Sequence, residues 1–358
     1  MKVELLIIGG GPAGLGAAYE SVRAGVETLL IDDGLKLGGQ LVKQTHKFFG
    51  SKLEYAGIRG IEIPDLILKE IDGAKNFRYI LNTTALGYYE DKSVAVLRDG
   101  KVSIVYPERL IVATGASEKM LPFKNSDLPG VYGAGAVQTL MNVYGVLPGR
   151  ASIMIGAGNI GLIVSYQLLQ AGVEVKAVVE ISNSVGGYWV HAAKIRRMGV
   201  PILTKHTIVE AIGDEVVKGA IIAQVDDSFE PIPGTEKKID CDTICIAVGL
   251  SPLVDLLFHA GCKMAYVPEL GGEVPLRNEE METSVKGIYV AGDASGVEEA
   301  SSAMLEGRIA GLAAARSLGY KIDDYDSRIS KLLDELKKLR ESPVFERVRK
   351  GYEHLKGF

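Results

Sequence analysis

The feature that most constrains this chain is an internal repeat of a glycine-rich segment. Residues 8–27 read IGGGPAGLGAAYESVRAGVE and residues 155–174 read IGAGNIGLIVSYQLLQAGVE, so half of the twenty positions match without a gap. Each copy follows a short apolar run, and its helical pattern ends at a glycine, Gly25 or Gly172. A second apolar run then leads to a carboxylate in both copies. The repeat therefore predicts two strand–turn–helix–strand units.

The glycine spacing assigns a physical role to each position of the turn. The first glycine permits a tight turn out of the strand, the second lets the backbone approach a pyrophosphate, and the third lets helix and strand pack closely. The pyrophosphate then lies at the helix N-terminus, where N–H groups and the helix dipole favour negative charge. The residues predicted to form these two turns are Gly9, Gly11, Pro12, Ala13 and Gly14 in the first copy, and Gly156, Gly158, Asn159, Ile160 and Gly161 in the second.

The carboxylate after the second strand is expected to accept hydrogen bonds from ribose hydroxyls. In the second copy this residue is Glu180, which would repel a 2′-phosphate, so NADH is favoured over NADPH. Arg196 and Arg197 lie downstream and could reach a phosphate, which leaves this preference open. The first copy ends in two acids: Asp32 has the usual spacing, whereas Asp33 aligns with Glu180. We favour Asp32 and keep Asp33 as the alternative.

Composition argues against several classes of protein. A net charge of −5 and a pI of about 5.7 argue against a nucleic-acid partner. Three cysteines, Cys241, Cys245 and Cys262, cannot form a disulfide framework or a four-thiolate metal site. No apolar run approaches the roughly 20 residues of a membrane span, and the N-terminal apolar segment lacks the basic region of a signal peptide. We expect a cytoplasmic protein without a metal site or a transmembrane segment.

Four shorter motifs follow the two glycine turns or lie between them. One of them, Gly292-Asp293, stands at the end of an apolar run and before a helical pattern over residues 298–311. A carboxylate in that place suits a bond to a ligand hydroxyl, and a helix N-cap is the alternative interpretation. The other three motifs are Gly38-Gly39-Gln40, Ala113-Thr114-Gly115 after an apolar run at 110–112, and Ala247-Val248-Gly249.

In this order the motifs resemble the pyridine-nucleotide flavoprotein superfamily, in its short, thioredoxin-reductase-like form. The resemblance covers roughly residues 1–320 and implies an α/β fold with two Rossmann-like domains. An NAD-binding domain, 119–248, would be inserted into a discontinuous FAD-binding domain, 1–118 with 249–320, and a helical tail, 321–358, would follow. The resemblance further implies that FAD and NAD contacts include Gly39, Gln40, Thr114, Gly115, Gly249, Gly292, Asp293 and Ala300.

The loop after the first glycine turn is expected near the flavin ring, which makes its polar residues candidates for catalysis. Lys43 or Lys47 could place a cation beside reduced flavin, and a solvated loop lysine is the alternative. His46 could carry a proton because its ordinary pKa lies near neutrality, although a structural role is the alternative. Thr45 completes the candidate set. Phe48-Phe49 is predicted to be core rather than a stacking platform.

Redox cysteines are missing from the places where disulfide reductases carry them. The region before the second glycine turn reads YGAGAVQ, and the region after the first reads GQLVK. Dithiol chemistry is therefore unsupported, and Cys241, Cys245 and Cys262 are interpreted as small buried residues. The stretches GAGAVQT and GGQLVKQTHKFFGS resemble FAD/NAD-binding subunits of multi-subunit amine and amino-acid dehydrogenases, such as sarcosine oxidase alpha, dye-linked proline dehydrogenase and hydrogen cyanide synthase.

That narrower resemblance implies an electron-transfer subunit that passes electrons between NAD(H) and a partner dehydrogenase or iron–sulfur subunit. Two alternatives stay open: a stand-alone NADH oxidase or reductase that uses oxygen, a quinone or a dye, and a non-catalytic nucleotide-binding scaffold. Self-association into a homo-oligomer is also left open.

Two further segments have alternative interpretations. In the charged tail, an apolar stripe predicts one helix, and a second short helix is expected over residues 344–355. This tail is expected either to dock on the FAD domain or to bind another subunit. Trp189 is expected to cover an adenine, to face a partner, or to belong to a domain core. The residues of the stripe are Ile329, Leu332, Leu333, Leu336 and Leu339.

Overall fold

The computed structural model describes residues 1–357, which divide into two compact units. The first unit contains residues 1–117 and the chain from residue 251 onward, and the second contains residues 118–250. The two segments that join the units pair as strands β7 (Ala116–Glu118) and β16 (Leu250–Pro252). Among the described residues, no helix has both the length and the apolarity that a bilayer crossing needs.

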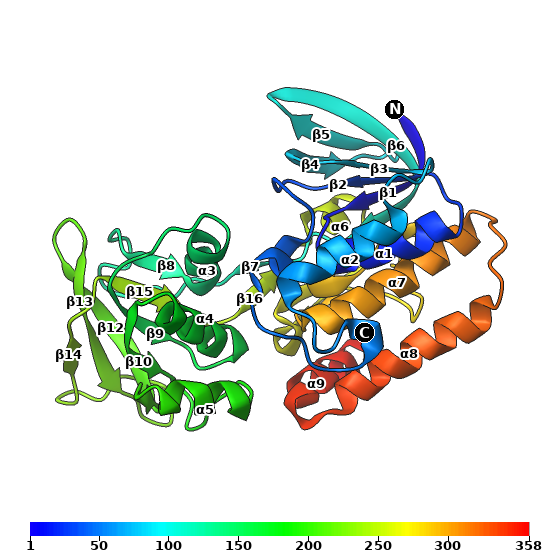
Figure 1. Cartoon of the computed structure of the whole chain (residues 1–358). Helices are drawn as coiled ribbons and strands as arrows, with labels where there is room; N and C mark the ends of the chain where they lie inside the picture. The colour runs from blue at the N-terminus through cyan, green and yellow to red at the C-terminus, as the bar shows by residue number, and fades with distance from the viewer. Residues whose placement is uncertain (358) are drawn as a thin grey trace. The chain divides into compact units, whose positions relative to one another are not determined.

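A seven-stranded sheet forms the centre of the first unit (Figure 1). Its order is β3-β2-β1-β6-β5-β4, with β19 paired to β6. Strands β1, β2 and β19 and the end of β6 coincide with predicted apolar runs, because a parallel strand covered on both faces has to be apolar. The edge strand β3, which reads FRYI and is partly exposed, was not predicted. The bounds are β1 (Lys2–Ile8), β2 (Thr28–Ile31), β3 (Phe77–Ile80), β4 (Thr83–Tyr88), β5 (Val94–Arg98), β6 (Lys101–Val112) and β19 (Ile288–Val290).

Three helices pack together against this sheet: α1 (Pro12–Arg23), α2 (Ile63–Ile71) and α7 (Ala300–Ser317) (Figure 1). Helices α1 and α7 can pack closely because Gly307 and Gly311 have no side chain. A Cβ on either glycine would collide with a carbonyl oxygen of α1. The helix expected from residue 298 begins at Ala300 and continues to Ser317. Smaller elements of this unit are η1 (Gly39–Lys43), η2 (Lys52–Glu54), η3 (Gly60–Glu62), α6 (Asp255–His259), β17 (Met264–Val267), η4 (Pro268–Leu270), β18 (Gly272–Pro275) and η5 (Gly292–Ser295).

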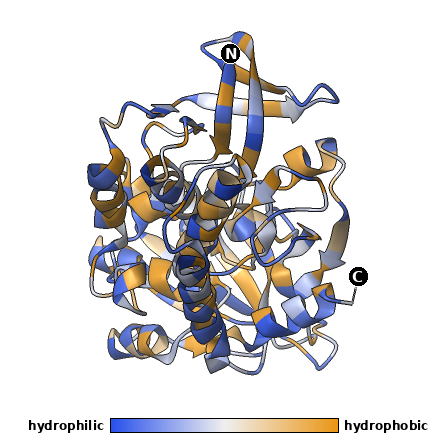
Figure 2. Cartoon of the chain, turned by 90° about the vertical axis from the view of Figure 1, so that its right-hand side faces the viewer, coloured by the Kyte–Doolittle hydropathy of each residue, from blue (hydrophilic) through white to orange (hydrophobic). Residues whose placement is uncertain are grey.

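The C-terminal tail folds back onto the first unit as α8 (Tyr325–Glu341), η6 (Pro343–Phe345) and α9 (Glu346–Leu355). Three stripe residues of α8, Ile329, Leu332 and Leu336, are buried in the cluster that contains α1 and α7, and Leu333 and Leu339 pack at its border. Of the two expected outcomes for the tail, docking on its own unit is the one observed. The helices in Figure 2 carry both hydrophilic and hydrophobic residues, as helices with one buried face do.

The second unit contains a five-stranded parallel sheet of order β11-β10-β9-β15-β8 and a smaller antiparallel sheet, β12-β13-β14. Its helices are α3 (Ala134–Asn142), α4 (Asn159–Gln170) and α5 (Trp189–Arg197). The strands are β8 (Val131–Gly133), β9 (Ala151–Ile155), β10 (Glu174–Val179), β11 (Ile202–Leu203), β12 (His206–Gly213), β13 (Val217–Gln224), β14 (Lys237–Ile239) and β15 (Thr243–Ile246).

Two predictions about aromatic residues are corrected. Phe48 is buried as expected, but Phe49 is 57% exposed, because the short loop that carries both residues can turn only one of them inward. Trp189 is 76% exposed at the first residue of α5, so the core interpretation is wrong for it.

Candidate functional site

Both predicted glycine turns have the same backbone geometry. Gly9 and Gly156 have φ values of +102° and +110°, a region that residues with a Cβ rarely adopt. A Cβ on Gly9 would also collide with the carbonyl oxygen of Ala113, and one on Gly156 with that of Ala247. The motifs Ala113-Thr114-Gly115 and Ala247-Val248-Gly249 therefore lie directly behind the two turns.

The third glycine of each turn is required for packing, whereas the second faces open space. A Cβ on Gly14 would collide with the carbonyl oxygen of Gly9, and Gly161 stands in the same relation to Gly156. By contrast, a Cβ on Gly11 would have only the Cα of Gly39 near it, at 3.9 Å, and one on Gly158 would meet nothing within 4 Å. Both second glycines are helix N-caps without a side-chain hydrogen bond. Each turn thus offers uncapped helix N–H groups and close backbone access, which fits a pyrophosphate.

The first turn is held by Asp32, and Asp33 takes no part in this. One carboxylate oxygen of Asp32 accepts the N–H of Gly10 at 2.6 Å, and the other accepts the N–H of Gly34 at 2.8 Å. The side chain of Asp32 is buried, while Asp33 is exposed. The carboxylate therefore orders the turn and stands at its edge.

Glu180 holds the second turn in the same way. Its Oε2 accepts the N–H of Ala157 at 2.7 Å, and its Oε1 accepts the N–H of Ser182 at 3.0 Å. Ala157 occupies the place in the second turn that Gly10 occupies in the first. Asp32 is therefore the counterpart of Glu180.

An ungapped alignment pairs Asp33 with Glu180 because the second copy has one additional residue before its acid. The pairing of β9 with β10 shifts between Val175 and Ala177, so Lys176 forms a β-bulge. Beyond the bulge the two copies are again in step, since Gly9 donates to the carbonyl of Ile31 and Gly156 to that of Val179.

Two further segments contact the first turn. Gly38 donates to the carbonyl of Gly10 at 2.8 Å, and a Cβ on Gly39 would lie 2.7 Å from the Cα of Gly11. Gly292 also approaches this turn, since a Cβ on it would lie 2.9 Å from the Cβ of Ala13. The structure thus brings the first turn, the loop at Gly39 and Gln40, and the Gly292-Asp293 pair together in one unit. Gln40 is exposed on this loop.

Asp293 follows β19 and is not the N-cap of α7, so the N-cap interpretation is wrong. That position belongs to Glu299, which forms a capping box with Ser302 one residue before Ala300 becomes helical. The carboxyl group of Asp293 accepts the N–H of Glu298 at 3.2 Å. Burial, together with the nearby carboxylates of Glu298 and Glu306, raises the pKa of Asp293 to about 7. Asp293 can therefore exchange a proton near neutral pH.

The segments next to strands β7 and β16 are joined by one side-chain and one main-chain hydrogen bond. The hydroxyl of Thr114 donates to the carbonyl of Leu253 at 2.7 Å, and Leu253 in turn donates to the carbonyl of Gly115 at 2.9 Å. Gly115 and Gly249 have φ values of +75° and +127°. Both glycines are therefore required by the backbone at these corners.

The loop with Lys43, Thr45 and His46 folds against residues 57–61. Gly60 donates to the carbonyl of His46 at 3.2 Å, and Arg59 donates to the carbonyl of Thr45. The ring of His46 stacks with Phe48 at 5.7 Å between centroids. Lys43, Thr45 and His46 are half-buried, and Lys47 is exposed. Their catalytic roles stay predictions.

A loop in the second unit packs directly on the second glycine turn. Gly187 donates to the carbonyl of Ala157 at 3.0 Å, and Tyr188 donates to the side-chain oxygen of Asn159 at 2.8 Å. A Cβ on Gly187 would lie 2.9 Å from the backbone N of Asn159. The exposed Trp189 follows at once, while Ile160 is the most exposed residue of the turn itself.

Sequence reasoning missed the carboxylate of Glu118. It accepts the N–H groups of Gly135 at 2.6 Å and Ala136 at 3.2 Å, so it occupies the N-terminus of α3. A Cβ on Gly133 or Gly135 would press on this carboxylate. The YGAGAVQ segment, where thioredoxin reductases carry their CxxC, is therefore a helix start built to accept an acid. Glycines alternating with alanine were the available signal, but they did not identify the partner.

The three thiols are buried and poorly ionised. Burial, with Asp242 nearby, raises the pKa of Cys241 to about 12, and burial also raises the pKa values of Cys245 and Cys262. Because the thiolate is the reactive form, we expect an aromatic disulfide reagent to label the native chain at least about 100-fold more slowly than the unfolded chain. Rapid labelling of one thiol in the native chain, with unfolded chain as control, would contradict this.

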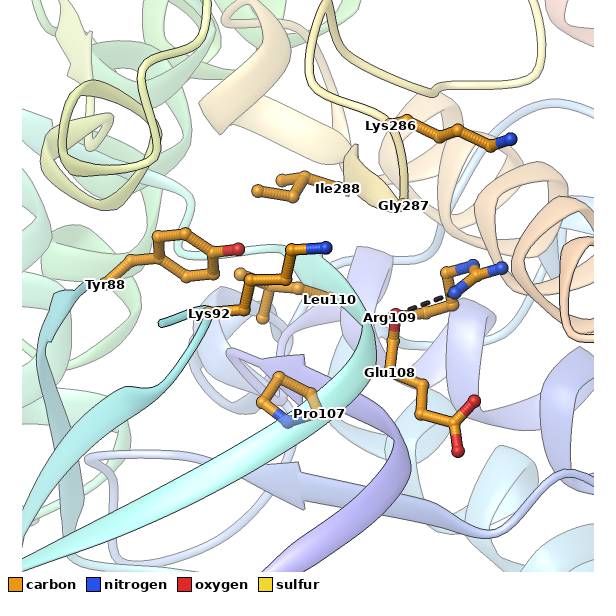
Figure 3. A pocket seen from close by; sticks show the side chains of 9 residues that line it. All are labelled: Tyr88, Lys92, Pro107, Glu108, Arg109, Leu110, Lys286, Gly287 and Ile288. Atoms are coloured by element: carbon orange, nitrogen blue, oxygen red, sulfur yellow. Dashed lines mark hydrogen bonds between the residues drawn. The ribbon is translucent and has the colours of Figure 1, made fainter. Parts of the chain in front are cut away.

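A separate pocket of about 260 Å³ lies at the amino end of β19 (Figure 3). Gly292 and Asp293 follow the carboxyl end of the same strand, so the pocket is not part of this site. In Figure 3 Lys92 and Tyr88 extend into it, whereas Lys286 points away. The guanidinium of Arg109 is bound to Ser317 and to the carbonyl of Glu108, so it is already committed to the fold.

Residues 3–307 match the family model for pyridine nucleotide-disulphide oxidoreductases. The chain belongs to this family. Its members typically bind FAD and NAD(P). Both the predicted resemblance and the predicted α/β fold, with two Rossmann-like sheets and C-terminal helices, are confirmed.

Relatives in this family include components of larger oxidases. One subunit of the opine oxidase of Agrobacterium tumefaciens (strain Ach5) is 29% identical, over 88% of this chain and 66% of that protein. The alpha subunit of sarcosine oxidase from Corynebacterium sp. (strain P-1) is 27% identical, over 90% and 33%. The HcnB subunit of hydrogen cyanide synthase from Pseudomonas protegens is 28% identical, over 87% and 70%. The chain thus spans 66% of the first relative and 33% of the second.

Two solved structures share the fold. L-proline dehydrogenase from P. horikoshii superposes with a TM-score of 0.72 at 24% identity, covering 92% of this chain and 59% of that one. Thioredoxin reductase from T. acidophilum gives the same TM-score at 21% identity, covering 88% and 98%.

Proposed function

We propose that this chain is an FAD-dependent oxidoreductase that transfers electrons between NAD(H) and its flavin. The observation that carries the proposal is the pair of uncapped glycine turns, each closed by one carboxylate with the same two backbone hydrogen bonds. We assign FAD to the turn beside Asp293 and NAD to the turn beside Glu180. In domain terms, residues 1–118 with 249–320 would bind FAD, and residues 119–248 would bind NAD.

In the first unit, each group of residues would hold a different part of FAD. The turn and the N-terminus of α1 would bind the pyrophosphate, and Asp32 would bind the adenosine ribose. Asp293, which is able to donate or accept a proton near pH 7, would bind a ribityl hydroxyl. Ala300, at the start of α7, would direct the positive end of the helix dipole at the ring. Gly39, Gln40, Thr114, Gly115 and Gly292 would line the remainder, and Gly249, at the end of the second unit, is proposed as a further cofactor contact.

Bound FAD would supply the hydride-accepting chemistry, so the protein has mainly to orient it and to exclude water. Lys43, Thr45 and His46 are proposed to line the ring from their half-buried loop. No general acid or base is required for the hydride transfer itself.

The deciding experiment is an absorbance spectrum of the purified full chain. A yellow protein whose colour is bleached rapidly by NADH without oxygen supports the proposal. A colourless protein, or one that carries only ADP or ATP, supports the nucleotide-binding scaffold instead.

The carboxylate of Glu180 should make NADH the preferred nucleotide, because it stands where a 2′-phosphate would be placed. We expect kcat/KM for NADH to exceed that for NADPH at least about tenfold in a dye-reduction assay. Glu180→Ala should bring the two kcat/KM values closer together. Glu174→Ala, which removes an exposed carboxylate at the amino end of the same strand, is the control that leaves their ratio unchanged. Equal efficiency with both nucleotides would contradict this assignment.

We further propose that the chain acts as an electron-transfer subunit beside a partner dehydrogenase or iron–sulfur subunit. Support comes from the relatives that are themselves named as subunits. Size-exclusion chromatography of the native protein tests this. If all the NADH-dependent activity elutes with this chain alone, the stand-alone NADH oxidase or reductase is the better description.

A further inference from the structure

The C-terminal tail reaches the proposed flavin site through a buried carboxylate, that of Glu306 on α7. Its Oε1 pairs with Arg277 at 2.5 Å and with Arg340, from the tail helix α8, at 2.7 Å. Its Oε2 accepts the N–H of Gly292 at 3.0 Å and the hydroxyl of Ser295 at 2.7 Å. One carboxylate thus joins the tail to the segment that begins with Gly292-Asp293.

Glu298 provides a second connection. The Nε of Arg340 lies 3.1 Å from both carboxylate oxygens of Glu298, and the hydroxyl of Tyr352, from α9, donates to Oε1 at 2.8 Å. The backbone N–H of Glu298 is the group that donates to Asp293. Both tail helices therefore hold the residue that contacts Asp293.

These contacts are deeply buried, so their loss would not be compensated by water. The side chains of Glu306, Glu298 and Arg277 are 2%, 4% and 8% exposed. Burial alone would raise the pKa of Glu306, but Arg277 and Arg340 lower it, so the carboxylate is charged. Without Arg340, the carboxylate of Glu298 would lose its ion pair in a site where water cannot replace it.

We propose that the tail, through Arg340 and Tyr352, positions residues 292–298 and thereby sets how tightly the first unit binds flavin. This inference rests on the proposed FAD site, and Arg340 acts in it as a positioning residue. Flavin affinity would then report whether the tail is docked.

The same tail helix offers a matched control in Arg328. It pairs with Glu20 of α1, whose side chain is 1% exposed and which also pairs with Arg308 at 2.7 Å. Glu306 and Glu20 thus each pair with one arginine from the tail and one from the rest of the unit. Glu20 lies eight residues from the start of α1, about 12 Å along the helix from the glycine turn. Its carboxylate is bound to Arg308 and Arg328 and to no group of residues 292–298 in the described part of the chain.

The experiment compares Arg340→Gln with Arg328→Gln in the full chain. Each apoprotein is titrated with FAD, and thermal unfolding and the visible flavin spectrum are recorded alongside. We expect both variants to lower Tm, but only Arg340→Gln to raise the Kd for FAD at least about tenfold and to shift the flavin bands. Arg340→Lys, which keeps the charge but not the forked contact, should recover part of the affinity.

Equal FAD affinities in the two glutamine variants would overturn the positioning role, because a purely structural tail would affect both alike. If Arg340→Gln does not fold, Tyr352→Phe is used in its place, since it removes only one hydroxyl. A higher Kd for FAD with a shifted flavin spectrum supports the proposal, and an unchanged Kd overturns it. Failure of the wild-type chain to bind FAD would instead refute the proposed function.

Discussion

Asp32→Ala is expected to yield a chain that is purified without flavin, whereas Asp33→Ala stays yellow. The carboxylate of Asp32 accepts two backbone N–H groups that order the first turn. Its removal leaves the N–H of Gly10 without its acceptor and takes away the proposed ribose contact. A hydrogen bond to a charged group contributes about 1.5–3 kcal/mol. A loss of about 3 kcal/mol of FAD-binding free energy, from the ribose contact and the disordered turn together, corresponds to about 100-fold weaker binding of FAD.

Asp33→Ala is a matched control. It removes the same charge from the next residue in the chain, whose side chain is exposed. FAD titration of both apoproteins, with circular dichroism to confirm folding, measures the difference. Asp32→Asn keeps the shape and one acceptor, so an intermediate Kd is expected. If Asp33→Ala lost flavin and Asp32→Ala retained it, the assignment of the ribose carboxylate would be wrong.

The sequence was sufficient for those parts of the site whose geometry is local. The glycine turn, the helix after it and the strand that ends at the carboxylate span about 25 consecutive residues, so their spacing predicts both the backbone and the carboxylate. The one ambiguity, Asp32 against Asp33, arises because a single residue, Lys176, is added to one copy. A β-bulge absorbs such an insertion without disturbing either end of the strand, and no ungapped alignment reveals it.

What could not be predicted depends on pairing between distant segments. Two examples are the contact of Glu118 with Gly135 and the ion pair of Glu20 with Arg328. Nothing in the sequence around these residues indicates which distant residue each one contacts. The apolar stripe of α8 predicted a helix with one buried face, but the stripe alone does not say which surface covers it. A single tryptophan has no periodicity at all, so the exposure of Trp189 could be learned only from the fold.

In the second unit, two neighbouring glycines should respond in opposite ways to the same added methyl group. Gly161→Ala would place its Cβ against the carbonyl oxygen of Gly156, which is backbone and cannot rotate away. Overpacking of this kind costs about 1–3 kcal/mol, which exceeds the helix-propensity gain of about 1 kcal/mol. We therefore expect a lower Tm for Gly161→Ala, measured by calorimetry or circular dichroism.

Gly158→Ala should instead cost at most about 1 kcal/mol, the difference between glycine and alanine at a helix N-cap, because its φ of −73° suits any residue and its Cβ would meet nothing within 4 Å. The methyl group would stand where a pyrophosphate has to approach the backbone, so we expect KM for NADH to rise at least about tenfold while the visible flavin spectrum is unchanged. Gly11→Ala is the counterpart in the first unit and should weaken FAD rather than NADH. An unchanged KM in folded Gly158→Ala would contradict nucleotide binding at this turn, whereas weaker NADH binding in Gly11→Ala with FAD unaffected would exchange the two assignments.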